Sequence, residues 1–280
     1  MFRAAVLTDL STIGNCSGSV SIAVMSAMGV EVCLIPTAIL SAQTGFGNSC
    51  IIDTSPYLND YINSVCNTAP GFDAVYIGFM NNMNSCAAAK KLIESCRDAA
   101  VIVDPISGDC GRRFGFMDER LYDFVAENAR LADIITPNLT ELCLLTDSCY
   151  DDLISLNEDD MIHQITMMCN KYISQNRGTV VVTGIDCGEF IANLTADSEN
   201  VSVIKAQRFG GSMSGTGDIL CSIVCAAAAK GENIHSAVQL SGEFISEVMK
   251  GADPSADRNF GIPYQNKLYL LCDKTKKDVS

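Results

Sequence analysis

A glycine-rich segment, Phe209-Gly-Gly-Ser-Met-Ser-Gly-Thr-Gly-Asp, leads into an apolar, alanine-rich run that predicts a helix. Glycines let backbone N–H groups approach a ligand closely, and the positive end of a helix dipole attracts phosphate oxygens. The segment therefore predicts an anion hole made by Gly215, Thr216 and Gly217. Asp218, beside a bound phosphate, is suited to take a proton from an attacking hydroxyl group. A plain helix cap explains the same residue, and the local pattern leaves both interpretations open.

Acidic and amide side chains also follow two of the predicted strands. Asn138 and Glu141 are three residues apart, so both lie on one face of a first helical turn, where they could orient hydrated Mg2+ and phosphate oxygens. A capping box produces the same spacing without a ligand. Asp104 ends a buried-looking strand and could help organise metal and phosphates. The loop that follows, with Arg112 and Arg113, could close over a nucleotide. The alternative is an ordinary Asp-Pro turn.

Neutral polar side chains follow two strands near the N-terminus. Ser11, Gln43 and Thr44 offer hydrogen-bonding groups of the kind that a small heteroaromatic substrate needs for a ring nitrogen and a phenolic oxygen. Each of them alone is equally well explained as a turn-forming residue.

The elements that position these residues follow an alternating pattern. Short β-branched runs alternate with longer segments of helical period, which predicts an α/β fold with a mostly parallel central sheet and helices on both faces, in three layers. An antiparallel hairpin is expected at the sheet edge. The expected strands are 4–8, 30–35, 74–78, 100–104, 133–136 and 179–183, with the hairpin at 189–194 and 201–205. The expected helices are 18–28, 56–67, 84–98, 118–130, 158–175, 217–230 and 234–250.

Composition narrows the classes of partner. The 33 acidic residues outnumber the 19 basic ones and give a net charge of -14, which disfavours nucleic acid and anionic membranes. The 14 cysteines contain no C-x-x-C pair and many lie in apolar runs, which indicates free thiols in a reducing compartment. Because no signal segment is visible, we expect a cytoplasmic protein. Residues 1–280 are expected to form one domain, with 273–280 as a solvated tail.

Taken in order, the motifs of this chain resemble the pyridoxal kinase branch of the ribokinase-like superfamily. The resemblance covers nearly the whole chain, and the motifs are specific in combination. They are Asp9-Leu-Ser with the Gly14 turn, Ser-Ala-Met-Gly at 26–29, Pro-Thr-Ala-Ile-Leu-Ser-Ala-Gln-Thr-Gly at 36–45, Asp-Pro-Ile-Ser-Gly-Asp at 104–109, Thr-Pro-Asn-Leu-Thr-Glu at 136–141, and Gly-Thr-Gly-Asp at 215–218.

The resemblance implies a ribokinase-like fold and phosphorylation of the 5′-hydroxymethyl group of pyridoxal, pyridoxine or pyridoxamine. The family uses ATP and Mg2+, often with a monovalent cation such as K+, and its members are usually homodimers. Asp218 would be the general base. The other implied roles are substrate binding for Ser11, Gln43, Thr44 and Gly45; ATP binding for Asp104, Asn138, Glu141, Thr183 and Gly184; and metal binding, mainly through water, for Glu141 and Asp104.

Three positions depart from the family pattern: Phe79 stands where many members have Tyr, Gln43 where many have His, and Thr183 where many have Lys. These departures leave the preferred vitamer open. The nearest alternative is a hydroxymethylpyrimidine or hydroxymethylpyrimidine phosphate kinase. Such enzymes typically have Cys at the position of Asp218. A second alternative is a vitamer-binding protein that has kept the fold without turnover.

Overall fold

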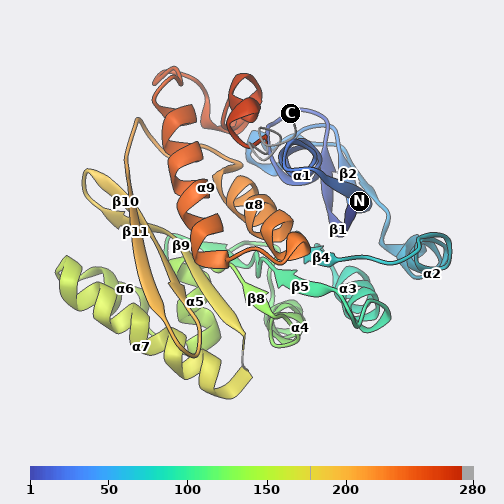
Figure 1. The fold of residues 1–280 in the computed structure, drawn as a ribbon, viewed down its shortest axis with the longest axis horizontal. Helices are drawn as coiled ribbons and strands as arrows, with labels where there is room; N and C mark the ends of the chain where they lie inside the picture. The colour runs from blue at the N-terminus through green and yellow to red at the C-terminus, as the bar shows by residue number, and fades with distance from the viewer. Residues whose placement is uncertain (177, 273–280) are drawn as a thin grey trace, which may run out of the picture.

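The computed structural model describes residues 1–176 and 178–272 and has a nine-stranded sheet at its centre (Figure 1). The strand order is β11-β10-β9-β8-β5-β4-β1-β2-β3. A separate small hairpin pairs β6 with β7. The strands are β1 (Phe2–Ser11), β2 (Val30–Leu40), β3 (Ile51–Asp53), β4 (Ala74–Ile77), β5 (Ala100–Val103), β6 (Gly108–Asp109), β7 (Arg112–Arg113), β8 (Ile134–Ile135), β9 (Thr179–Cys187), β10 (Phe190–Ala196) and β11 (Val201–Gln207).

The six central strands, from β2 to β9, are parallel, and antiparallel strands flank them on both sides. Strands such as Ala74–Ile77 are buried along their whole length, because helices cover both faces of the sheet. The hairpin of β10 and β11 forms one edge. The predicted α/β fold class, including the antiparallel edge hairpin, is confirmed.

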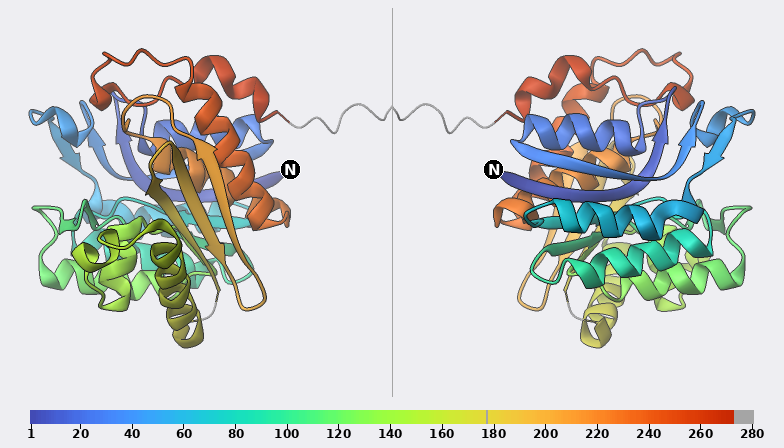
Figure 2. Two further views of the ribbon diagram at one scale, coloured as in Figure 1. Left: turned by 90° about the vertical axis from the view of Figure 1, so that its left-hand side faces the viewer. Right: turned by 90° about the vertical axis from the view of Figure 1, so that its right-hand side faces the viewer.

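Helices pack on both faces of the sheet and make it the middle of three layers (Figures 1 and 2). The first group, α1, α8 and α9, shares one buried cluster, and the others pack on the opposite face. The helices are α1 (Ser17–Ala27), α2 (Leu58–Thr68), α3 (Met83–Ser95), α4 (Glu119–Ala129), α5 (Leu139–Thr146), α6 (Tyr150–Ile154), α7 (Glu158–Asn176), α8 (Thr216–Lys230) and α9 (Ile234–Met249). Four 3-10 turns are η1 (Thr44–Phe46), η2 (Ser55–Tyr57), η3 (Arg258–Phe260) and η4 (Gln265–Leu270). Within the described ranges, no helix is long and apolar enough to cross a membrane.

The long elements begin and end within a few residues of the predicted positions, with three extensions. Strands β1, β2 and β9 run on to Ser11, Leu40 and Cys187, past the predicted ends at 8, 35 and 183. Short elements that were not predicted are β3, the β6–β7 hairpin and α6. The expected tail at 273–280 lies outside the described residues.

An irregularity between β1 and β2 lies next to the carboxyl edge of the sheet. Thr8 pairs with Pro36 but Leu10 pairs with Ile39, so β2 carries one extra residue. Proline has no N–H for the ladder, which accounts for the break at this point. Asp9 lies at the irregularity and is only 5 % exposed. The sheet therefore holds a carboxyl group inside the protein near the end of β1.

Candidate active site

The carboxyl ends of the parallel strands and the N-terminus of α8 meet at one edge of the sheet. In open parallel sheets, this edge is where ligands bind. The predicted chemical residues Asp104, Asn138, Glu141 and Asp218 all follow strands there or lie in the first turns of α5 and α8. The structure thus brings together residues that are up to 114 positions apart in the chain, from 104 to 218.

The N-terminus of α8 has backbone N–H groups without a side-chain cap. Gly215 is the N-cap residue, with a left-handed φ of 87°, and no side chain caps the helix. A Cβ atom at Gly215 would lie 2.0 Å from the carbonyl oxygen of Asn15, so only glycine fits. A Cβ atom at Gly217 would meet nothing within 4 Å. The first turn therefore presents donors to open space, as an anion site requires.

Asp218 lies in this first turn but does not cap the helix. The residue as a whole is half-buried, but its carboxylate is buried and accepts a hydrogen bond from the backbone N–H of Ser17, whose φ is 51°. Desolvation raises the pKa of Asp218 to about 6, with the charge of Asp9 adding to the effect and the Ser17 N–H opposing it. At neutral pH the group is ionised yet much more basic than an ordinary aspartate.

Asp9 is also a member of the site, although the motif Asp9-Leu-Ser carried no predicted role for its carboxylate. Its carboxylate accepts hydrogen bonds from the hydroxyls of Ser11, at 3.1 Å, and of Ser17. Burial raises the pKa of Asp9. Ser17 therefore connects the two carboxylates, through its hydroxyl to Asp9 and through its N–H to Asp218. The available signal was a carboxylate at the end of an apolar strand.

Asp104 and Glu141 form the other side of the carboxylate cluster. Burial, then the charge of Asp218, raise the pKa of Asp104 to about 7, although Cys221 and Thr136 donate hydrogen bonds to it. Burial and the charge of Asp104 raise the pKa of Glu141 well above its usual value. We define the carboxylate cluster as Asp9, Asp104, Glu141 and Asp218.

Asn138 and Glu141 do form the capping box that the spacing allowed. Asn138 Oδ1 accepts from Glu141 N at 3.0 Å, and Glu141 Oε2 accepts from Asn138 N at 2.9 Å. Further bonds tie the box to the next loop: Ser107 N donates to Glu141 Oε1 at 3.0 Å, and Asn138 Nδ2 donates to the Gly108 carbonyl at 2.8 Å. Both side chains are thereby fixed at the sheet edge.

Asp104 and Glu141 are the predicted residues for holding Mg2+. Among the described residues, no group of three or more Asp, Glu, His or Cys side chains is placed to hold a metal directly. Both carboxyl groups are buried and have raised pKa values, so a nearby cation would favour their ionised forms. These residues fit a hydrated ion held through water, as Mg2+ prefers.

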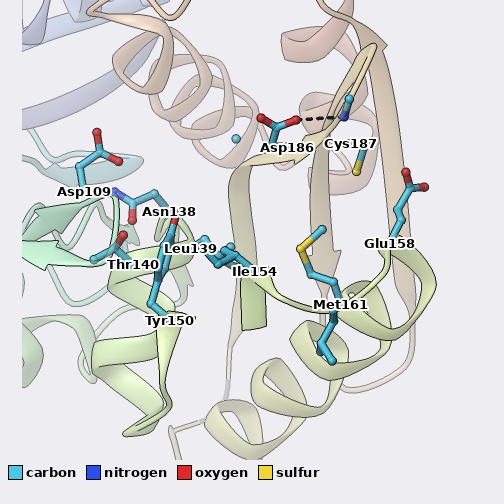
Figure 3. A pocket seen from close by; sticks show the side chains of 13 residues that line it. Asp109, Asn138, Leu139, Thr140, Tyr150, Ile154, Glu158, Met161, Asp186 and Cys187 are labelled. Carbon is cyan, nitrogen blue, oxygen red and sulfur yellow. Dashed lines mark hydrogen bonds between the residues drawn. The ribbon is translucent and has the colours of Figure 1, made fainter. Parts of the chain in front are cut away.

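A cavity of about 500 Å3 opens beside α5 and the turn that follows β9. Figure 3 shows Asp109 and Asn138 on one side of it and Asp186 and Cys187 on the other. Gly184 lines the cavity, and Thr183, whose N–H donates to the Pro137 carbonyl at 2.9 Å, pairs with Asn138. No sequence motif indicated its apolar lining, which is Leu139, Tyr150, Ile154, Leu156 and Met161. We call this space the α5–β9 cavity.

The predicted substrate-side residues lie near the C-terminal segment. Gln43 Nε2 donates to the carbonyl oxygen of Asn259 at 3.0 Å, and its Oε1 accepts from Gly45 N at 2.9 Å. A Cβ atom at Gly45 would lie 2.3 Å from Asn259 Oδ1. Thr44 is exposed. The Gln43 amide is thus engaged with protein groups, and Asn259 is a partner that no local pattern indicated.

Two aromatic residues, Tyr76 and Phe79, lie near the end of β4. Phe79 packs edge-to-face on Phe116, with ring centroids 5.5 Å apart. The hydroxyl of Tyr76 is buried and has no partner among the described residues, although it lies within electrostatic range of Asp104 and Asp218. Arg113, expected to reach over a nucleotide, instead pairs with Glu119 and lies over the Tyr122 ring, 4.2 Å from its centroid.

The profile of the phosphomethylpyrimidine kinase family matches residues 19–262. The chain belongs to this family. It is therefore a member of a kinase family, which is a family of phosphotransferases. The resemblance to the pyridoxal kinase branch of the ribokinase-like superfamily is confirmed by the relatives that follow, because pyridoxine and pyridoxal kinases are prominent among them.

Of three curated relatives, two are named as kinases of B6 vitamers and one as a kinase of hydroxymethylpyrimidine and its phosphate. A pyridoxine kinase from Bacillus subtilis is 27 % identical over 187 residues, which is 66 % of each chain. A pyridoxine/pyridoxal/pyridoxamine kinase from Bordetella avium is 24 % identical over 256 residues, covering 84 % of this chain and 80 % of the relative. A hydroxymethylpyrimidine/phosphomethylpyrimidine kinase from Aquifex aeolicus is 22 % identical over 180 residues, covering 64 % and 67 %.

Solved structures share the fold over almost the whole chain. A protein from Bacteroides thetaiotaomicron, provisionally named a phosphomethylpyrimidine kinase and crystallised with pyridoxal, is 24 % identical with a TM-score of 0.87, covering 96 % of this chain and 95 % of its own. Pyridoxal kinase from Lactobacillus plantarum is 23 % identical with a TM-score of 0.84, covering 97 % and 96 %. The ribokinase-like architecture is confirmed.

Proposed function

We propose that this chain transfers the γ-phosphoryl group of ATP to the 5′-hydroxymethyl group of pyridoxal, pyridoxine or pyridoxamine. The observation that carries the proposal is Asp218, an ionised but unusually basic carboxylate in the first turn of α8. The uncapped N–H groups of that turn supply an anion hole at Gly215, Thr216 and Gly217. A base and an anion hole on one helical turn suit transfer of a phosphoryl group to an alcohol.

In the proposed reaction, the hydroxyl oxygen of the substrate attacks the γ-phosphorus while Asp218 accepts the hydroxyl proton. The bond between the γ-phosphorus and the oxygen bridging to the β-phosphate breaks, and that oxygen leaves with ADP. The N–H groups of Gly215, Thr216 and Gly217 stabilise the negative charge on the transferred group. Asp218 then holds the proton, which its pKa of about 6 allows it to release to water near neutral pH.

We assign ATP to the α5–β9 cavity. Its apolar lining suits an adenine ring; Asn138 and Gly184 also line it, and Thr183 pairs with Asn138. Asp104 and Glu141 would hold hydrated Mg2+ through water. When bound, the ion neutralises phosphate charge. Relatives crystallised with ADP or AMP-PCP, from Bacillus subtilis and Staphylococcus aureus, are pyridoxal kinases of the same fold.

The B6 vitamers are assigned to the opposite side of Asp218. Ser11, Gln43, Thr44 and Gly45 follow β1 and β2 there, and Phe79 adds an aromatic surface at the end of β4. Support comes from the curated B6 kinases and from the Bacteroides structure with pyridoxal. Because Gln43 already bonds to Asn259 and Gly45, we expect it to shape this side of the site through those contacts.

Hydroxymethylpyrimidine or its phosphate is the second candidate substrate, because the family profile and the Aquifex relative carry that activity in their names. The test is an ATP-consumption assay with pyridoxal, pyridoxine, pyridoxamine and hydroxymethylpyrimidine, each with Mg2+ and with or without K+. A kcat/KM at least tenfold higher for a vitamer than for hydroxymethylpyrimidine is expected. The reverse order would assign the pyrimidine activity. Measurable vitamer binding with no turnover of any compound would support a binding protein.

A further inference from the structure

Arg258 lies in η3, a single turn that is attached to the loop preceding α8. The Arg258 carbonyl accepts a hydrogen bond from Ser214 N at 3.2 Å, and Ile262 N donates to the Ser214 carbonyl at 3.0 Å. Asp257 caps the turn by accepting from Asn259 N at 2.9 Å. These bonds place the backbone of Arg258 directly beside Gly215, where the proposed anion hole begins.

The guanidinium group of Arg258 is exposed, and no ion pair or hydrogen bond to it is found within residues 1–176 and 178–272. Its positive charge does act on Cys110, at the turn of the β6–β7 hairpin, where it opposes the rise in the thiol pKa that Asp109 causes. Arg258 therefore reaches from the anion-hole loop toward the hairpin. Asp109 of that hairpin lines the α5–β9 cavity.

The surroundings of the proposed phosphate site are otherwise negative. The carboxylate cluster adjoins it through Asp218 in the first turn of α8, and Asp109, Glu158 and Asp186 line the α5–β9 cavity. Arg113 is engaged by Glu119 and Tyr122, and Arg208 is engaged by Asp186. A nucleoside triphosphate that enters this site brings several more negative charges. Arg258, whose backbone adjoins Ser214 and whose guanidinium is uncommitted, is the residue suited to meet them, since arginine binds phosphate oxygens in pairs.

We propose that Arg258 is a phosphate-binding residue whose guanidinium contacts the terminal phosphate of the bound nucleoside triphosphate, opposite the N–H groups of Gly215 and Gly217. This inference rests on the proposed function for the location of the nucleotide. The terminal phosphate is assigned because Arg258 adjoins Ser214 and Gly215, whereas the adenine side of the cavity lies beyond Asn138. The same contact stabilises charge on the group being transferred.

The experiment is calorimetric titration of the full chain with AMP-PCP and with ADP, both with Mg2+. For Arg258→Gln, the affinity for AMP-PCP should fall about 10- to 100-fold, as expected for loss of a charged hydrogen-bonded contact. The affinity for ADP should change less than about threefold, because ADP lacks the terminal phosphate. Arg258→Lys should fall between wild type and Arg258→Gln, since lysine keeps the charge but not the paired donors.

The matched control is Arg97→Gln, which removes an exposed arginine from the loop between α3 and β5, at the amino ends of the strands. It should bind both nucleotides as wild type does. Unchanged AMP-PCP affinity in Arg258→Gln, with wild-type melting temperature, would overturn the inference, and so would an equal loss for ADP. A wild-type chain that binds neither nucleotide would contradict the proposed function as well. Turnover of a different acceptor would contradict only the B6 assignment.

Discussion

Asp218 and its three acidic neighbours show what the site requires of individual residues. Burial raises the pKa of every member of the carboxylate cluster, and for Asp104, Glu141 and Asp218 the charge of a neighbouring member adds to the effect. Such groups destabilise a fold when they are ionised, so their retention points to a use in binding cations and moving protons. Ser17 limits the cost by donating to both Asp9 and Asp218.

The first prediction concerns Asp218→Asn. The amide keeps an oxygen for the Ser17 N–H but cannot accept the substrate proton, so kcat should fall by about two to four orders of magnitude. Calorimetric affinity for ADP should stay within about threefold of wild type. Asp123→Asn, an exposed change on α4, is the control. A kcat close to that of wild type would rule out Asp218 as the base.

The second prediction is a pH profile. Asp218 must be ionised in the free enzyme to act as a base, and its pKa is about 6. Log kcat/KM should therefore rise with pH through about 6 and level off above it, instead of levelling off near 4 as for an ordinary aspartate. Steady-state rates between pH 5 and 8 measure this limb. A profile that is flat from pH 5 upward would show that a different group, or no titrating base, limits the reaction.

The third prediction concerns Glu141→Gln. If Glu141 holds hydrated Mg2+, loss of its charge should raise the Mg2+ concentration needed for half-maximal rate by about 10-fold. The capping box should persist, because glutamine can still accept from the Asn138 N–H. A titration of initial rate against Mg2+ at saturating ATP gives the result. Wild-type Mg2+ dependence would leave Glu141 with the capping role alone.

Among the elements, sequence periodicity located the long helices and buried strands, because one apolar face or a continuous apolar run is a local property. Strands β6 and β7 are two residues long and β3 is three, which is too short for an apolar period to show, although each pairs with a segment nearby in the chain. The site partners, by contrast, are non-local: Gln43 and Asn259 are 216 residues apart. The glycine-rich turn before α8 was predictable, but its contact with Asn15 and the link from Ser17 to Asp9 and Asp218 were not.

The fourth prediction compares two glycines in the turn that begins α8. In Gly215→Ala the new Cβ atom would meet the Asn15 carbonyl at 2.0 Å in a left-handed backbone, so the protein should lose about 2 kcal/mol of stability or more. Gly217→Ala, whose Cβ meets nothing within 4 Å, should be neutral or slightly stabilising. Denaturant unfolding of both variants measures the difference. Equal stability of the two would mean that the Gly215 loop is looser than its contacts with Asn15 indicate.

At the scale of the whole molecule, the excess of acidic residues and the buried carboxylates both make the folded protein more stable as the pH falls. The chain carries a formal charge of -14, and self-repulsion of like charges weakens as acidic groups take up protons. Asp104 and Asp218 have folded-state pKa values of about 7 and 6, above the unfolded value of 3.8. Between pH 3.8 and about 7, the folded protein binds more protons at these two groups than the unfolded chain does. Lowering the pH within this range therefore favours folding.

The fifth prediction is therefore that thermal stability rises as pH falls from 7.5 to about 5.5. The melting temperature should increase by several degrees, since about 1 kcal/mol corresponds to roughly 2–4 °C in a protein of this size. Exposed pairs with lowered pKa values, such as Asp186 with Arg208, should lose their contribution only below about pH 4, outside this range.

Differential scanning calorimetry of the double variant Asp104→Asn, Asp218→Asn should show a higher melting temperature at pH 7.5 and a much flatter pH dependence. Asp60→Asn with Asp123→Asn removes the same formal charge from exposed positions. If this surface variant flattened the profile equally, net charge would be the cause and the buried carboxylates would not.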